Sequence, residues 1–186
     1  HSFGINDTVE IAVSYVAGGA ATALFTALDE RQQIQCSGPY GRFCLSEKDT
    51  NARYILIGTG TGVTPYRAML PQLKQLMDSR GVQVVLLFGS RTEDDLIYRE
   101  DFYQFAENNP KFRFMPCFSR GIPANASADA RLGYVQNQLA ELAPNGAHDI
   151  AYLCGNPNMV DASFEALKEF GLSVHHIRRE KYVSSK

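Results

Sequence analysis

The stretch YILIGTGTGVTPYRAML, residues 54–70, decides the fold of this chain. Its first part, YILIG (54–58), is a continuous apolar run, which is typical of a strand covered on both faces of a sheet. A glycine-rich turn follows, and Pro65 suits the first turn of a helix, which we expect over about 66–79. The stretch therefore predicts a strand, a tight turn and a helix in direct succession.

The turn is suited to hold a phosphate, and its candidate binding residues are Gly58, Thr59, Gly60, Thr61, Gly62, Thr64 and Pro65. Glycines at every second position let the backbone turn sharply and approach an anion without a Cβ in the way. The free N–H groups and the dipole of the following helix attract the same anion. Any turn between a strand and a helix can hold glycines, and the pattern is not G-x-G-x-x-G. Its position between strand and helix nevertheless favours the pyrophosphate of a dinucleotide.

The alternation of strand and helix continues to the C-terminus. Further strands are predicted over 82–89, 112–118, 149–155 and 173–178, with helices near 99–108, 134–142 and 157–170. The longest loop, 121–133, is polar and rich in small residues. Five strands alternating with four helices predict an α/β fold, a doubly wound five-stranded parallel sheet of the Rossmann-like kind.

Residues 1–52 follow a different pattern of short strands and turns. A strand is predicted where Val9, Ile11, Val13 and Tyr15 alternate with less apolar residues, and Gly18-Gly19 ends it. Ala21, Leu24, Phe25 and Leu28 then repeat at helical spacing. The segment QIQCSGPYGRF (33–43) is expected to form a strand, a tight turn and another strand. We therefore expect two domains, 1–52 and 53–186.

A cysteine stands at the end of one predicted strand. DIAYLCG (149–155) contains Cys154, and Gly155, Asn156 and Pro157 lead into the next helix. A buried cysteine is most often a small apolar residue, yet the carboxyl ends of parallel strands are where ligands bind. A small, polarizable side chain there leaves room for a planar ring. Both interpretations stay open on this segment alone.

Hydroxyl, arginine and amide side chains follow two other strand ends and the loop after the third strand; they belong to Ser90, Arg91, Ser119, Arg120, Arg131, Tyr134 and Gln136. An arginine with hydroxyl neighbours can hold a phosphate through charge-assisted hydrogen bonds, although a solvated surface arginine is about as common. The strand end FGSR carries no acid, and Glu93, Asp94 and Asp95 come slightly later. Lack of an acid there removes the usual partner of a ribose diol and makes a 2′-phosphate easier to accept.

Composition excludes several classes of protein. The formal net charge is -2, which gives no general attraction to nucleic acid or to an anionic membrane. No apolar run reaches the ~18 residues of a membrane helix, and the N-terminus lacks the features of a signal peptide. None of the four cysteines forms a C-x-x-C pair, so we expect no iron–sulfur cluster and no metal site. Scattered thiols fit a reducing cytoplasm.

With these motifs in order, the chain resembles the ferredoxin–NADP reductase superfamily. The matching segments are GGAAT, GPYGRF, GTGTGVTP, FGSRTEDDLIYREDF, CFSR, GYVQ, YLCGNPNMV and REKY. In that family a small antiparallel barrel holds FAD and a second domain holds NAD(P)H. The resemblance implies that Gly19 and Thr22 lie at the flavin pyrophosphate and that the turn from Gly60 to Thr64 lies at the pyrophosphate of NAD(P)H.

The resemblance also implies roles near the reacting rings and the 2′-phosphate. It places Cys154 beside the nicotinamide and matches Glu180 and Tyr182 to the family's C-terminal acid and flavin-covering aromatic residue. Ser119, Arg120 and Tyr134 match positions that read the 2′-phosphate in NADP-using members. The lysine that such members often carry just before the tyrosine is absent, and Arg131 is a candidate substitute, so the choice between NADP and NAD stays open.

The N-terminus departs from the family pattern. Members carry an R-x-Y-S flavin motif after several barrel strands, whereas this chain opens with His1-Ser2-Phe3-Gly4, which resembles only the tail of that motif and leaves Ser2 as its flavin-binding candidate. We therefore expect residues 1–52 to be the C-terminal part of an FAD-binding barrel and residues 53–186 to be a complete NAD(P)H-binding domain. Such a chain is expected to hold FAD weakly on its own.

The resemblance implies a flavoprotein oxidoreductase. Hydride would pass from NAD(P)H to FAD, and electrons would then reach a ferredoxin- or flavodoxin-type acceptor. One alternative is the NADH-dependent reductase component of an oxygenase, whose acceptor is that oxygenase component. A nucleotide-binding module without catalysis is the alternative from another class, and a plain α/β phosphate-binding protein would leave the order of motifs unexplained.

Overall fold

A computed structural model describes residues 10–35, 37–38 and 40–182. The chain forms two compact units, residues 1–42 and 43–186. Residues 43–52 thus lie with the second unit, where Leu45 and Asp49 are buried. The assignment of residues 1–52 to a flavin domain stays a prediction.

The second unit is built on one parallel sheet. Its strands are β1 (Arg53–Thr59), β2 (Gln83–Ser90), β3 (Phe112–Phe118), β4 (Arg131–Leu132), β5 (Asp149–Gly155) and β6 (Ile177–Lys181), in the order β4-β3-β2-β1-β5-β6. Every neighbouring pair is parallel. The predicted α/β doubly wound fold is confirmed.

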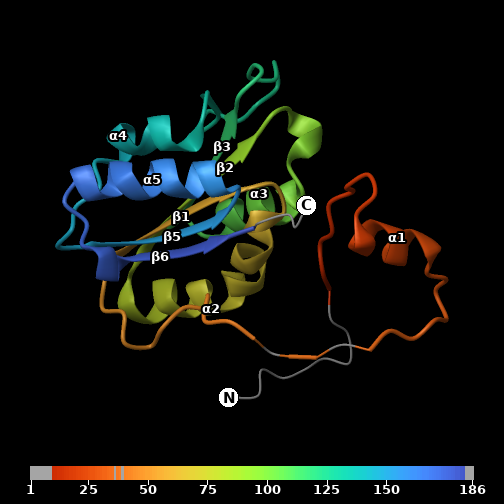
Figure 1. Cartoon of the computed structure of the whole chain (residues 1–186). Coiled ribbons are helices and arrows are strands. Elements are labelled where there is room, and N and C mark those ends of the chain that lie inside the picture. Colours follow the sequence, from red (N-terminus) through yellow and green to blue (C-terminus); the bar gives the residue numbers. More distant parts are fainter. Residues whose placement is uncertain (1–9, 36, 39, 183–186) are drawn as a thin grey trace. The chain divides into compact units, whose positions relative to one another are not determined.

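Helices cover both faces of this sheet (Figure 1). On one face lie α2 (Thr64–Arg80) and α3 (Arg99–Asn108), and on the other lie α4 (Leu139–Leu142) and α5 (Pro157–Glu169). Four 3₁₀ turns complete the described part of this unit: η1 (Gly60–Val63), η2 (Glu93–Asp95), η3 (Val135–Gln138) and η4 (Val174–His176). Because parallel strands run the same way, η1 and the starts of the helices meet at the carboxyl edge.

Two apolar layers make the core, one on each side of the sheet. Alternate residues of β1 show the division, since Leu56 packs with Tyr66 and Leu73 of α2 while Ile57 packs with Leu139 and Phe164 on the other face. All five of β1's central residues are buried, which explains why this strand reads as a continuous apolar run.

Three predictions for this unit need correction. The sheet has six strands rather than five, because the two-residue strand β4 forms inside the expected loop 121–133. The strand expected over 173–178 begins later, at Ile177, after the turn η4. The helix expected over 134–142 is η3 followed by the short α4. The first two lie at the edges of the sheet, where half-exposed strands carry a weak apolar pattern. In the third, Val135, Leu139 and Leu142 are buried at helical spacing, although the first turn is a 3₁₀ turn.

The first unit contains one helix among its described residues, α1 (Ala20–Ala27), which confirms the helical spacing there. The strand predicted over 9–15 is wrong for residues 10–15, and Val9 lies outside the described residues. The strands predicted within 33–43 are also not formed by the residues described there. A strand needs partners for its backbone N–H and C=O groups, and no described segment of this unit pairs with either stretch. The barrel stays a prediction.

None of the described helices has the length and apolar character to cross a membrane.

Candidate functional site

The register of the central strands brings three predicted site residues into one row. Gly58 of β1 pairs with Cys154 of β5, and Cys154 pairs with Glu180 of β6. Tyr182 follows β6 and donates its backbone N–H to the carbonyl of Gly155 at 2.9 Å. Cys154, Glu180 and Tyr182 therefore lie together at the carboxyl edge, beside the glycine-rich turn.

The turn packs tightly against the end of β5. A Cβ on Gly62 would stand 2.3 Å from the carbonyl oxygen of Cys154, and one on Gly58 would stand 2.9 Å from Val63 and 3.0 Å from Tyr66. Gly60 differs, because its φ is +54° and a Cβ there would meet nothing within 4 Å. The chain's own packing thus requires glycine at 58 and 62, and only Gly60 presents bare backbone to open space.

The start of α2 has the features of an anion site. No side chain caps this helix, and its first turn carries no acid. The hydroxyl oxygen of Thr64 is buried and has no hydrogen-bond partner among the described residues. A buried unpartnered hydroxyl is costly unless a ligand or water completes it. Thr64 N–H itself donates to the carbonyl of Thr61, and Pro65 has no N–H, but no side chain caps the start of this 17-residue helix, and its dipole attracts an anion.

Cys154 is a neutral thiol in this row. Its side chain is fully buried, and burial raises its pKa to about 11, an effect that a hydrogen bond with Tyr182 opposes and the Glu180 carboxylate reinforces. Burial likewise raises the pKa of Tyr182. At neutral pH both groups keep their protons, so this pair adds no negative charge beside Glu180.

A second group of predicted residues gathers at the ends of β2 and β3. The backbone N–H and the hydroxyl of Ser119 both donate to the carbonyl of Ser90, at 3.0 and 3.3 Å, and Arg120 N–H donates to the carbonyl of Arg91 at 3.2 Å. Gly133 N–H donates to Phe118 at 2.8 Å and so brings Tyr134, 63% exposed, to the same edge.

The arginines at this edge differ in the carboxylates that their side chains already bind. Arg91 makes a two-point contact with Asp95, at 3.0 and 2.9 Å, and Arg131 makes one with Glu141, at 2.6 Å for each bond. The guanidinium of Arg120 is exposed and contacts no carboxylate of the described chain. Gln136 has a buried side-chain oxygen that lacks a partner among the described residues. Arg120 is therefore the available cation.

Comparison with known proteins agrees with this geometry. Residues 56–164 match the family of oxidoreductase NAD-binding domains. Over 180 residues, 93% of its length, the chain is 32% identical to ferredoxin–NADP reductase B of Sorangium cellulosum and covers 71% of that protein. The chain belongs to the ferredoxin–NADP reductase superfamily.

The chain is also similar to two longer proteins. The chain is 32% identical to the phenol hydroxylase P5 protein of Acinetobacter pittii, over 95% of this chain and 50% of that protein. A solved cytochrome P450 reductase from Amycolatopsis superposes with a TM-score of 0.77 at 33% identity, over 91% of this chain and 50% of the other. The chain spans about half the length of these two relatives.

The residues that the superfamily resemblance assigns to the flavin lie in the first unit. Gly19 precedes α1, and the Thr22 hydroxyl accepts the backbone N–H of Val16 at 2.9 Å. Ser2 lies outside the described residues. The flavin roles of these three residues stay predictions.

Three residues that follow Cys154 in the segment YLCGNPNMV have structural roles. Gly155 has a φ of +127°, and a Cβ there would stand 2.7 Å from the Thr59 carbonyl. Asn156 caps α5 by accepting from Asn158 N–H at 2.9 Å, and Pro157 begins that helix. Asn156 N–H donates to the Thr59 hydroxyl at 3.1 Å, which fastens the turn after β1 to the turn after β5. Their contact with a nucleotide stays a prediction.

Sequence reasoning missed Tyr66 as a member of this site. Its buried hydroxyl lies 2.8 Å from the carbonyl of Ile57 and 2.7 Å from that of Tyr152, and its ring fills the space that the bare Gly58 leaves. In the sequence, a tyrosine near the start of a helix has the pattern of an ordinary core residue. Gly58, which lies opposite the ring, is the one residue whose identity indicates this role.

The thiols of this superfamily member should differ in reactivity. With a pKa of about 11, roughly one Cys154 in a thousand is a thiolate at pH 8. We expect iodoacetamide to label the exposed Cys44 first and Cys154 slowly, with the Cys154 rate rising as the pH approaches 11. Peptide mass spectrometry over time measures both rates. Equal labelling of the two at pH 8 would contradict the burial of Cys154.

Proposed function

We propose that the chain binds NAD(P)H at the carboxyl edge of its sheet, in an enzyme that transfers hydride from this nucleotide to FAD and electrons onward to a ferredoxin- or flavodoxin-type acceptor. The observation that carries the proposal is the row of Gly58, Cys154 and Glu180 beside the uncapped start of α2. The similarity to ferredoxin–NADP reductase B supports the acceptor class.

The start of α2 would hold the pyrophosphate. Backbone N–H groups after Gly60 and the hydroxyl of Thr64 supply donors there, and Thr61 lies between them, partly exposed. The helix dipole adds attraction for negative charge. These contacts fix the nucleotide without any covalent chemistry by the protein.

Cys154 would form the floor on which the nicotinamide rests. Its small, protonated side chain leaves room for a planar ring and presents no competing charge. Glu180 lies across from it in the register, and Tyr182, whose backbone N–H donates to the carbonyl of Gly155 at 2.9 Å, follows β6 beside the same row. When bound, FAD accepts the hydride and releases electrons singly. The protein's contribution is orientation, which can account for a large part of a rate enhancement.

Cys154→Ala tests the proposed contact between Cys154 and the nicotinamide ring. We expect the rate of flavin reduction by NADPH to fall about tenfold, which is ~1.4 kcal/mol of transition-state free energy, while the nucleotide Kd changes less than about twofold. Anaerobic stopped-flow reduction of the full-length protein and an equilibrium titration measure the two quantities. Cys117→Ala is the matched control, because Cys117 is equally buried but packs on the opposite face of the sheet. An unchanged rate with much poorer binding would refute the role given to Cys154.

Dye reduction by the full-length protein with FAD separates the classes of function. A superfamily reductase transfers electrons from NAD(P)H to an artificial acceptor, whereas a module that only binds nucleotide does not. Absence of dye reduction, with intact nucleotide binding, would favour the non-catalytic module. The retention of Cys154 and Glu180 speaks against that outcome, since binding alone requires neither.

A second candidate is the NADH-dependent reductase component of an oxygenase. It is favoured by the similarity to the phenol hydroxylase P5 protein and to the reductase subunit of an aromatic O-demethylase, 34% identical and also covered over about half its length (52%). Stopped-flow oxidation of the reduced protein by a ferredoxin, a flavodoxin or an oxygenase component distinguishes the acceptors. Fastest transfer to the oxygenase component would replace the first proposal.

We infer a cytoplasmic setting for this enzyme. The described thiols at positions 44, 117 and 154 are far apart in the sequence, and two of them are buried. Such scattered thiols are typical of a reducing compartment.

A further inference from the structure

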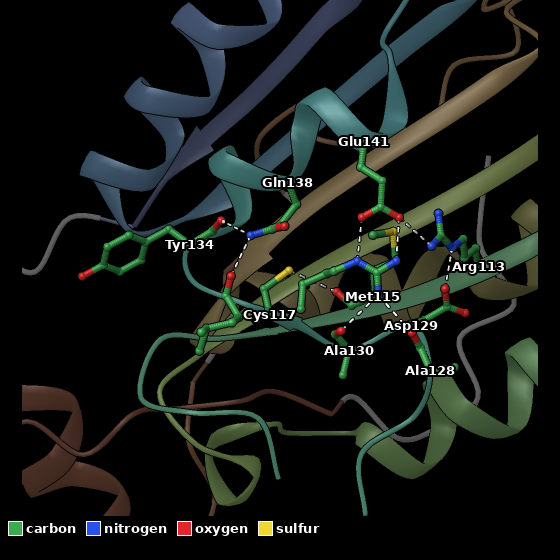
Figure 2. Close-up of polar contacts among 11 residues, drawn as sticks. Arg113, Met115, Cys117, Ala128, Asp129, Ala130, Tyr134, Gln138 and Glu141 are labelled. Carbon is green, nitrogen blue, oxygen red and sulfur yellow. Dashed lines mark hydrogen bonds and ion pairs between the residues drawn. The ribbon is translucent and has the colours of Figure 1, made fainter. Parts of the chain in front are cut away.

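Four charged side chains form a network beside β4 (Figure 2). Glu141 of α4 accepts two bonds from Arg131 at 2.6 Å and one from Arg113 at 2.9 Å, and Arg113 also donates to Asp129 at 2.7 Å. The charges of these four residues sum to zero. The two arginines lower the pKa of Glu141 from 4.5 to about 2. The network therefore keeps its full stabilisation above pH 4.5 and loses it only as the pH falls towards 2.

The network uses nearly all the donors of Arg131. Its Nη1 donates to the carbonyls of Ala128 and Ala130, each at 3.0 Å, while Nε and Nη2 are bound to Glu141. Four of the five N–H groups of an arginine are thus engaged. The sequence interpretation that Arg131 substitutes for a phosphate-binding lysine does not fit this arrangement.

The network also draws Arg131 away from the proposed nucleotide edge. Arg131 pairs with Cys117 in the register, and Cys117 packs on the α4 face of the sheet. Glu141 bonds at once to Arg113, near the amino end of β3, about 20 Å along the strand from Ser119. The guanidinium of Arg131 thus points towards the wrong end of β3 to meet a nucleotide.

Only a short distance separates the base of Arg131 from the candidate 2′-phosphate residues. Cys117 precedes Ser119 by two residues, about 7 Å of strand. An extended arginine side chain spans that distance. Position 131 could therefore deliver a cation to this edge if Glu141 did not hold it.

We propose that Glu141 is a specificity-determining residue: by holding Arg131 against α4, it limits the preference of this enzyme for NADPH over NADH. The inference rests on the proposed function. Arg120 then remains the one arginine available to a 2′-phosphate among those described at this edge. A substitution that releases Arg131 adds a second cation and strengthens NADPH binding, because the 2′-phosphate carries about two negative charges.

Glu141→Gln tests the proposal in the full-length protein. The ratio of the NADH Kd to the NADPH Kd, measured by titration at pH 7.5 and low salt, is expected to rise about threefold to tenfold. The gain should disappear in Glu141→Gln combined with Arg131→Gln, and Arg131→Gln alone should leave the ratio unchanged. Asp129→Asn is the matched control, because it also removes one negative charge from the network but leaves both Arg131 and Arg113 bound to Glu141.

Each outcome has a distinct meaning. An equal loss of affinity for both nucleotides in Glu141→Gln, or a ratio that does not move, would show that the network only supports the loop and would overturn the inference. A rise of the same size in Asp129→Asn would assign the effect to overall charge and would also overturn it. If the wild-type protein bound neither nucleotide, the proposed function itself would fail. Should Glu141→Gln not fold, a change of the ratio in Arg131→Gln alone would contradict the proposal.

Discussion

Gly62→Ala is expected to destabilise the second unit by about 3 kcal/mol and to abolish nucleotide binding at the turn. A Cβ at this position would stand 2.3 Å from the carbonyl oxygen of Cys154 and 2.6 Å from the Cα of Gly155. Both atoms are backbone, so no side chain can rotate away, and either the turn or the end of β5 has to move. Because the same movement displaces Cys154, hydride transfer should be lost with binding.

Gly60→Ala is the matched control for the effect of this substitution on stability. Gly60 has the left-handed φ of +54°, but a Cβ there would meet nothing within 4 Å. Its expected cost is therefore the conformational one alone, about 1 kcal/mol. Urea unfolding gives the two free energies and an NADPH titration gives the two affinities. Equal destabilisation by both substitutions would show that the turn can yield at Gly62 and that the close contact is not a constraint.

The central strands of the sheet could be predicted because burial on both faces determines their sequence pattern directly. The bounds of β3, β5 and α3 agree with those expected from the sequence, and the apolar run 54–58 lies inside β1. A parallel strand buried on both faces has to be apolar at every position, so a continuous run identifies it without knowledge of its partners. The helices between these strands then follow from right-handed crossovers.

The edges were not predictable for the opposite reason. β6 carries Arg178, Arg179, Glu180 and Lys181, a sequence with the composition of a solvated tail, and becomes a strand only because β5 offers its free side. β4 has two residues and exists only through Cys117 and Phe118. In residues 10–15, by contrast, the alternation is present and no described partner pairs with it. Pairing with a distant segment decides such elements, and periodicity does not encode it.

The site was only partly predictable from the sequence. Strand order and register are needed to place Cys154 between Gly58 and Glu180, although each residue could be named beforehand. The roles of Gly58 and Gly62 depend on what lies opposite their missing side chains. Whether the guanidinium of Arg131 can bind a ligand depends on Glu141, which lies ten residues later on another element and already binds it. An arginine in a sequence carries no sign of which carboxylate holds it.

Arg120→Ala should separate the two nicotinamide nucleotides. Its guanidinium is exposed, and no carboxylate of the described chain engages it, beside Ser119 at the end of β3. Charge-assisted bonds to a 2′-phosphate are worth roughly 2 kcal/mol, so we expect the Kd of NADPH to rise about thirtyfold and that of NADH less than about twofold. Titration of both nucleotides with the full-length protein, at several salt concentrations, measures this difference.

Arg99→Ala provides the control for loss of a surface charge. Arg99 is paired with Glu93 and Glu100, so its removal takes away one positive charge without exposing a candidate phosphate site. If both nucleotides lost affinity equally in Arg120→Ala, the side chain would be acting on a part that NADH and NADPH share. The 2′-phosphate assignment would then fail, and the NADH-linked oxygenase reductase would become the better account, because no other arginine described at this edge is open to a second phosphate.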